Sequence, residues 1–125
     1  MDCWEQLAAI LGWESQDPEL AAEHFLTVAS YNLQHPAQFT EEALESLKIS
    51  LIDYLDHGIP AQTLRQRANK AYNGKKRVLK RESERHPVLR HWNMTIANVY
   101  LPGGPQGAAD RVRRWAAVIR RELVY

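Results

Sequence analysis

The chain has 125 residues, of which 45% are apolar and 25% charged, and its formal net charge is +1. This composition is that of an ordinary globular protein and excludes a disordered or collagen-like chain. No window approaches the roughly 18 uncharged apolar residues that a membrane-spanning helix needs, and the single cysteine, Cys3, excludes an internal disulfide. The acidic first residues do not have the pattern of a signal peptide. We therefore expect a cytoplasmic protein with no membrane partner that forms one helical domain over residues 1–125.

The apolar pattern is helical from the first residues onward. Four residues follow the i, i+3, i+4, i+7 spacing of one helix face, and these are Trp4, Leu7, Ala8 and Leu11. Asp17 and Pro18 have the order of an N-cap and a first helical position, which predicts a second helix over about residues 18–34. This helix is apolar on nearly every side, so we expect it in the middle of a bundle. Pro36 ends it, because proline disfavours the α conformation in the residue before it.

Two more helices are predicted before the basic part of the chain. Thr40 is a candidate N-cap for the first of them. Its expected buried stripe consists of Leu44, Leu47, Leu51, Tyr54 and Leu55. Gly58 is expected to end this helix, and Pro60 to begin a weaker one that continues to Ala71.

The rest of the chain becomes regular only in its last helix. Residues 75–92 are rich in Lys and Arg and show little periodicity, and residues 93–101 fit either a strand or a short helix. The last predicted helix keeps one apolar face, formed by Ala108, Val112, Trp115, Ile119 and Leu123. The sequence therefore predicts an all-α, single-domain bundle of about five helices around the central apolar helix of residues 18–34.

Candidate binding residues cluster on that central helix. His24 and His35 fall on one helix face but about 16 Å apart along the axis, so a metal ion would need a turn at Pro36 or a further ligand such as Cys3. The alternative is that each histidine is an ordinary core residue with two hydrogen bonds and that the protein has no cofactor. Tyr31 and Gln34 lie on the same helix and could bind a ligand together with His24 and His35. Alternatively, the polar side chains near the end of the helix could satisfy its free carbonyl groups.

No catalytic motif is present. The sequence has no glycine-rich phosphate loop, nucleophile elbow or paired-cysteine motif. We therefore assign no catalytic residues and favour a binding protein over an enzyme.

The charges are divided between the two halves of the chain. Residues 1–64 contain one basic and eleven acidic residues, whereas residues 65–125 contain fifteen basic and four acidic ones. The halves could neutralise each other on folding, or they could bind a protein partner or a second copy of the chain.

The basic segment of residues 65–91 offers a third possibility, which is nucleic-acid binding. Its candidate phosphate contacts are Lys75, Lys76, Arg77, Lys80 and Arg81. No nucleic-acid-binding motif accompanies them and the whole chain is almost neutral, so we favour protein binding.

The run from His24 to Pro36 (HFLTVASYNLQHP) resembles the central motif of a bacterial family known as domain of unknown function 5946. Residues 94–99 and the pair Trp115-Ala116 are similar to the C-terminal half of that family. Many members begin with a Cys-Pro-x-Cys-Gly element, which implies a metal, but here Cys3 stands alone and is followed by tryptophan. The resemblance implies a small bacterial helical protein and supplies no activity.

Overall fold

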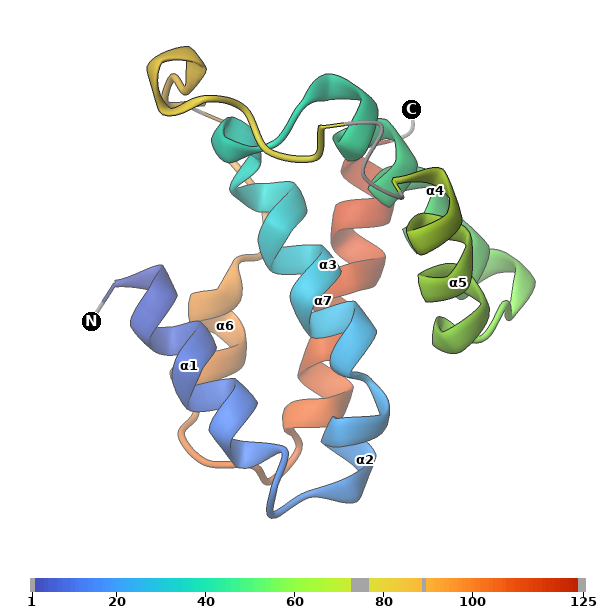
Figure 1. Cartoon of the computed structure of the whole chain (residues 1–125). Coiled ribbons are helices and arrows are strands. Elements are labelled where there is room, and N and C mark those ends of the chain that lie inside the picture. Colours follow the sequence, from blue (N-terminus) through green and yellow to red (C-terminus); the bar gives the residue numbers. More distant parts are fainter. Residues whose placement is uncertain (1, 73–76, 89, 124–125) are drawn as a thin grey trace. The chain divides into compact units, whose positions relative to one another are not determined.

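The computed structural model describes residues 2–72, 77–88 and 90–123, and the named elements in these ranges are all helices (Figure 1). The α-helices are α1 (Cys3–Trp13), α2 (Pro18–Ala22), α3 (His24–Gln34), α4 (Glu41–His57), α5 (Ala61–Ala71), α6 (Ile96–Tyr100) and α7 (Ala108–Leu123). Two short 3-10 helices, η1 (Pro36–Gln38) and η2 (Glu82–Glu84), accompany them. The predicted all-α class is confirmed. Within the described ranges, no helix is long and apolar enough to cross a membrane.

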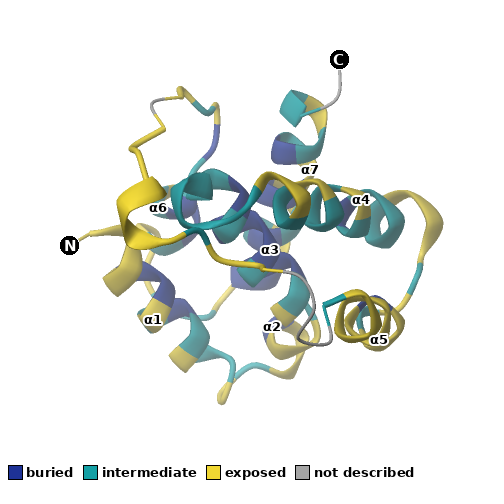
Figure 2. Ribbon diagram, turned by 45° about the horizontal axis from the view of Figure 1, so that its top comes forward, coloured by how far each residue is buried: buried dark blue, intermediate teal, exposed yellow. Residues whose placement is uncertain are grey.

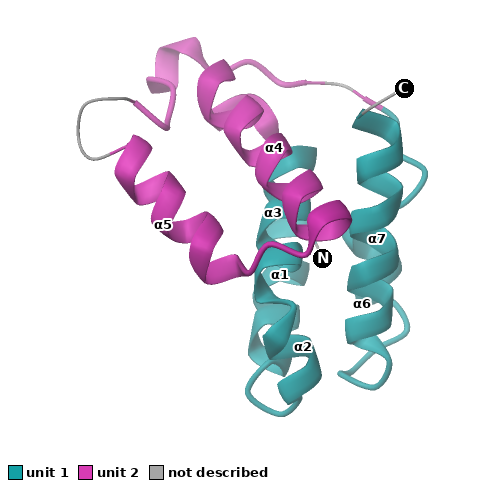
Figure 3. Ribbon diagram, turned by 90° about the vertical axis from the view of Figure 1, so that its right-hand side faces the viewer, with its two compact units in different colours: residues 1–34, 91–125 teal, residues 35–90 magenta. Residues whose placement is uncertain are grey.

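The chain divides into two compact units (Figure 3). Unit 1 contains residues 1–34 and 91–125, and unit 2 contains residues 35–90. The buried apolar side chains are distributed unevenly between them. Among the described residues, unit 2 contributes only Leu51 and Leu64, and the other buried apolar residues belong to unit 1.

The core of unit 1 forms where α3 packs against α7. Trp115, Val112 and Ile119 on α7 are fully buried, as is the face of α3 that carries Leu26 and Ala29 (Figure 2). Burial of this kind stabilises a helix that has little intrinsic stability of its own. The predicted α7 face is confirmed over most of its length, while Leu123 is only half-buried.

The predicted helix over residues 18–34 is instead two helices that meet at Glu23. The backbone of Glu23 leaves the helical region, with φ −100° and ψ 19°. Its N–H donates to the carbonyl of Leu20, a tightened i to i−3 bond that ends α2. Its carbonyl then accepts from the N–H of Thr27 and starts α3. The prediction of one central helix is therefore wrong at this residue, although Leu26 and Leu33 on α3 are buried as expected.

The α1 helix buries a different face from the one that the sequence suggested. Trp4 is 66% exposed, whereas Leu7 and Ile10 are buried. Apolar residues occur on more than one side of this helix, so its spacing allows two faces, and packing against α6 decides between them. The helix also continues past Gly12 to Trp13, whose ring stacks on Tyr100 of α6 with centroids 5.8 Å apart.

Within the ambiguous residues 93–101, Ile96–Tyr100 form α6, so the helical alternative is confirmed and the strand alternative is wrong. The N–H of Thr95 donates to the side chain of Asn98 at 2.9 Å, which fixes the start of this short helix. Ile96 and Val99 are then buried, and α6 packs on both α1 and α7.

Unit 2 is built on the predicted helix that begins after Thr40. The hydroxyl of Thr40 accepts from the N–H of Ala43 at 3.2 Å, which confirms the N-cap. Gly58 ends α4 in the left-handed region at φ 65°, a conformation that favours glycine. Of the five-residue stripe expected to be buried on α4, only Leu51 is fully so, and the others are half-buried.

Candidate functional site

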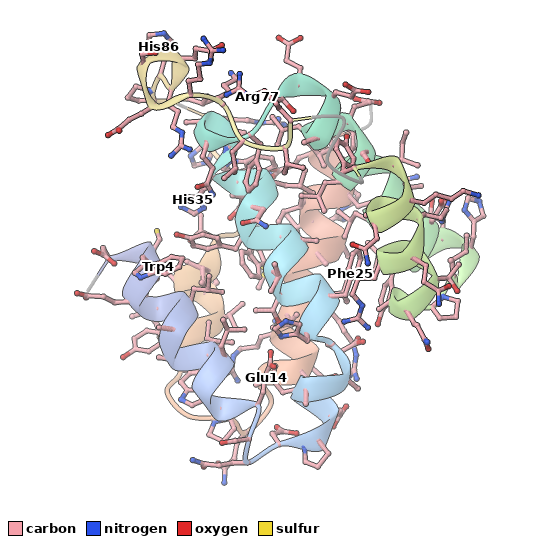
Figure 4. The ribbon with its side chains drawn as sticks, viewed as in Figure 1. Trp4, Glu14, Phe25, His35, Arg77 and His86 are labelled. Atoms are coloured by element: carbon pink, nitrogen blue, oxygen red, sulfur yellow. The ribbon has the colours of Figure 1, made fainter. Side chains whose placement is uncertain are left out.

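The proposed metal ligands do not come together. His24 is the first residue of α3 and is exposed, and its Nδ1 lies 2.9 Å and 3.0 Å from the two carboxylate oxygens of Glu14 (Glu14 is labelled in Figure 4). Since α3 is a regular helix, His35 follows it about 16 Å further along the axis. Cys3 is an exposed thiol at the start of α1. In the part of the chain that the structure describes, no three His, Cys, Asp or Glu residues form a metal-binding group.

The side-chain amide of Gln34 makes two hydrogen bonds within unit 1. Its Oε1 accepts from the indole N–H of Trp115 at 3.1 Å, and its Nε2 donates to the carbonyl of Met94 at 2.8 Å. The amide therefore joins the end of α3 to α7 and to the segment before α6. A buried indole N–H needs such an acceptor. Both polar atoms of the Gln34 amide are therefore bonded within the unit, to groups outside the end of α3.

Tyr31 is also part of the packing between helices. Its ring is buried and packs edge-to-face with the ring of Trp4, with centroids 6.3 Å apart and planes at 60°. Burial raises the pKa of the Tyr31 phenol, and the nearby Cys3 and Asp2 raise it further. The phenol is therefore neutral at physiological pH.

The basic segment is held to the start of α4 by its backbone. The N–H of Thr40 donates to the carbonyl of Val78 at 2.9 Å, and the N–H of Lys80 donates to the carbonyl of Gln38 at 2.8 Å. The Thr40 hydroxyl also donates to the carbonyl of Arg77 at 2.9 Å.

The charges of that segment are partly balanced within it. A Glu84 carboxylate oxygen lies 3.8 Å from Arg77 and 4.0 Å from Arg81. Both arginines are exposed, and Lys80 is half-buried. Lys75 and Lys76, the other two predicted phosphate contacts, lie outside the described residues.

Part of the charge split is neutralised within unit 1 by Arg113 on α7. Its guanidinium donates to Glu23 at 2.7 Å, to Glu19 at 2.8 Å and to Asp110 at 2.8 Å. Hydrogen bonds from Arg113 to these carboxylates raise the pKa of the guanidinium above its ordinary value, Glu19 most of all. Arg113 from the basic half of the chain thus pairs with Glu19 and Glu23 from the acidic half. This is the neutralisation on folding that was one of the two interpretations of the charge division.

A surface groove in unit 2 was not foreseen from the sequence. It has a volume of about 550 Å³ and lies between α4 and α5. One wall carries Glu42 and Glu45 from α4, and the other carries Arg67 and Lys70 from α5. The apolar lining consists of Ile49, Ala68, Ala71 and Tyr72. Ile49 is 50% exposed.

The sequence does contain a signal for this groove. Glu42, Glu45, Ser46 and Ile49 follow the i, i+3, i+4, i+7 spacing of one helix face. That face lies away from the expected buried stripe, and its single large apolar residue was not enough to mark it as a surface for binding.

An ion-pair cluster joins the two helices that form the groove. Arg67 donates to Asp53 at 2.9 Å, and His57 lies 3.2 Å from the same carboxylate. The hydrogen bond from Arg67 is the main cause of a lowered pKa for Asp53, and His57 contributes to it. The cluster is close to the turn at Gly58, so it sets how α5 returns along α4 (Figure 1).

We expect the stabilising effect of Asp53 to depend on pH in one direction. The pKa of Asp53 is lower in the folded than in the unfolded chain, where it has its ordinary value of 3.8. Ionised Asp53 therefore stabilises the fold fully at a pH above this ordinary pKa, and the effect disappears as the pH falls through the folded pKa. Asp53→Asn should therefore be less stable than the parent chain at neutral pH, and the two should converge in acid. Denaturant midpoints of both proteins across this range test the expectation, which fails if their difference is independent of pH.

Comparisons with known proteins place the chain in a family without giving it an activity. No curated protein matches it, and no solved structure matches it either. A family model does match, over residues 1–124, and the family is described as one of unknown function. This match confirms the resemblance that the run from His24 to Pro36 suggested. The chain therefore belongs to the family of unknown function DUF5946.

Proposed function

We propose that this protein works by binding another protein, and that the partner packs into the groove between α4 and α5. The observation that carries the proposal is the half-exposed Ile49, an apolar side chain that lines this groove together with the charged residues of α4 and α5. An apolar centre with a polar rim is the usual arrangement of a protein-binding surface.

The exposure of the lining favours a protein over a small molecule as the partner. Most of the lining is exposed, including Ile49, Ala68 and Ala71. A small-molecule site encloses most of its ligand, whereas a helix that lies in a groove contacts such a surface along its length. A partner that covered the exposed half of Ile49 would gain about 1 kcal/mol from that side chain alone.

The small number of buried residues in unit 2 supports the same proposal. Leu51 and Leu64 are its only fully buried apolar side chains among the described residues. Figure 2 shows α5 exposed along most of its surface. Two helices with so few buried residues gain stability when another helix covers them, because helices in proteins depend on packing of their apolar faces.

We further propose that the protein works in the cytoplasm. The support is chemical: the single cysteine, Cys3, is an exposed free thiol, and a reducing compartment keeps such a thiol from oxidation.

Gel filtration of extracts from cells that express the full chain at low level tests the binding proposal. We expect the parent chain to elute in a complex that nuclease leaves intact. Ile49→Arg should return it to the size of the free chain, because a partner that covered position 49 would then have to bury a charged guanidinium.

Leu101→Arg is the matched control for this experiment, because Leu101 is 71% exposed but lies in unit 1. This variant should elute with the complex. Elution of the parent at the size of the free chain, or a complex that survives Ile49→Arg, would overturn the proposal. A complex that nuclease dissolves would instead favour nucleic-acid binding through Arg77 and its basic neighbours.

A further inference from the structure

We infer that the occupant of the α4–α5 groove is a second copy of this chain, an inference that rests on the proposed protein-binding function. The groove carries opposite charges on its opposite walls: Glu42 and Glu45 on α4 face Arg67 and Lys70 on α5. A partner of a single charge would be attracted by one wall and repelled by the other. A second copy of the same groove offers both charges in the same spacing.

The direction of the two helices makes this match possible. Residues 42–50 near the start of α4 line the groove together with residues 67–72 at the end of α5, so the two helices run antiparallel. When two copies meet with a two-fold axis along the groove, the acidic wall of each copy lies on the basic wall of the other. The result is a four-helix arrangement of two hairpins, and it covers the exposed side of Ile49 in both copies.

One exposed charge on each wall is suited to such a contact. Glu45 is 63% exposed and lies 3.5 Å from Lys48 on the same helix, a surface pair that contributes little. Lys70 is exposed in the last turn of α5. Arg67 is less suitable for a test, because it also bonds to Asp53 and its loss would disturb the hairpin itself.

Charge reversal on each wall, followed by mixing, tests the inference with purified full-length protein. Sedimentation velocity over about a hundredfold range of concentration should show the parent chain dimerising by mass action. Glu45→Lys leaves the acidic wall with one acidic and one basic residue, and Lys70→Glu does the same to the basic wall. Each variant alone therefore loses an attraction between the walls and gains a like-charge contact, and it should dimerise about tenfold more weakly or not at all. An equal mixture of the two variants should regain the parent's dimerisation, because each restored contact then joins opposite charges.

Arg114→Glu is the control, since it makes the same charge change as Lys70→Glu at an exposed residue of α7 in unit 1. It should dimerise like the parent. A parent chain that is monomeric at all concentrations, or a mixture that dimerises no better than either variant, would overturn the inference. If the parent is monomeric when pure but forms an Ile49-dependent complex in extracts, protein binding stands and only the second copy as occupant is excluded.

Discussion

Trp115→Ala should lower the free energy of unfolding by about 3–5 kcal/mol. Trp115 is fully buried at the centre of unit 1, and its indole N–H is bonded to Gln34. The substitution therefore leaves a cavity as large as an indole ring and removes one hydrogen bond of the core. Denaturant unfolding followed by far-ultraviolet circular dichroism measures the loss.

Trp4→Ala is the matched control for this substitution. Trp4 is 66% exposed, and its ring meets that of Tyr31 in an edge-to-face arrangement. Its removal should cost less than about 1 kcal/mol, the size of an aromatic contact at the surface. Equal losses for the two variants would contradict the placement of the core between α3 and α7.

Gln34→Leu should lower the free energy of unfolding by about 1–3 kcal/mol. The leucine fills a similar volume but leaves the N–H of Trp115 and the carbonyl of Met94 without the bonds that Gln34 provides. A buried polar group that is left without its hydrogen bond lowers stability more than the removal of both bonding partners does. The measurement is again the denaturant midpoint, with circular dichroism at both ends of the transition.

A double-mutant cycle with Trp115→Phe separates this hydrogen bond from packing. Phenylalanine has no ring N–H, so replacing Gln34 in the Trp115→Phe background leaves no buried N–H without an acceptor at position 115. The double variant should therefore lose less stability than the two single variants lose together. Strictly additive losses would show that Gln34 and Trp115 are not coupled.

The sequence predicted helices best where one apolar face is unambiguous. In α7 the apolar residues recur on a single face, and the structure buries Val112, Trp115 and Ile119 there. The start of α4 was predicted equally well, because the Thr40 cap is a local feature. Local propensity and periodicity are sufficient in such cases.

Features that depend on distant residues could not be predicted. No glycine or proline marks the break between α2 and α3 at Glu23. The carboxylate of Glu23 accepts a hydrogen bond from Arg113, ninety residues further along the chain. The two possible faces of α1 likewise needed α6 to decide between them. Of the candidate site, Gln34 and Tyr31 were predicted to bind a ligand or to satisfy the carbonyl groups at the helix end, and the sequence could not show that they contact Trp115 and Trp4.

The groove was missed for a related reason. Ile49 is one apolar residue on a polar face of α4, and only the return of α5 places Ala68 and Tyr72 opposite it. That return depends on the turn at Gly58 and on the pair between Asp53 and Arg67. A sequence read one helix at a time does not reveal a surface that two helices share.

Photo-cross-linking from position 49 in living cells is the most direct measurement of whether the groove binds a protein. A benzoylphenylalanine in place of Ile49 reacts only with groups that lie against it, and the same residue in place of Leu101 reports the background of an exposed position in unit 1. We predict a discrete protein adduct from position 49 and none from position 101. Absence of an adduct from position 49, or the same adducts from both positions, would contradict the assignment of the α4–α5 groove as the binding surface.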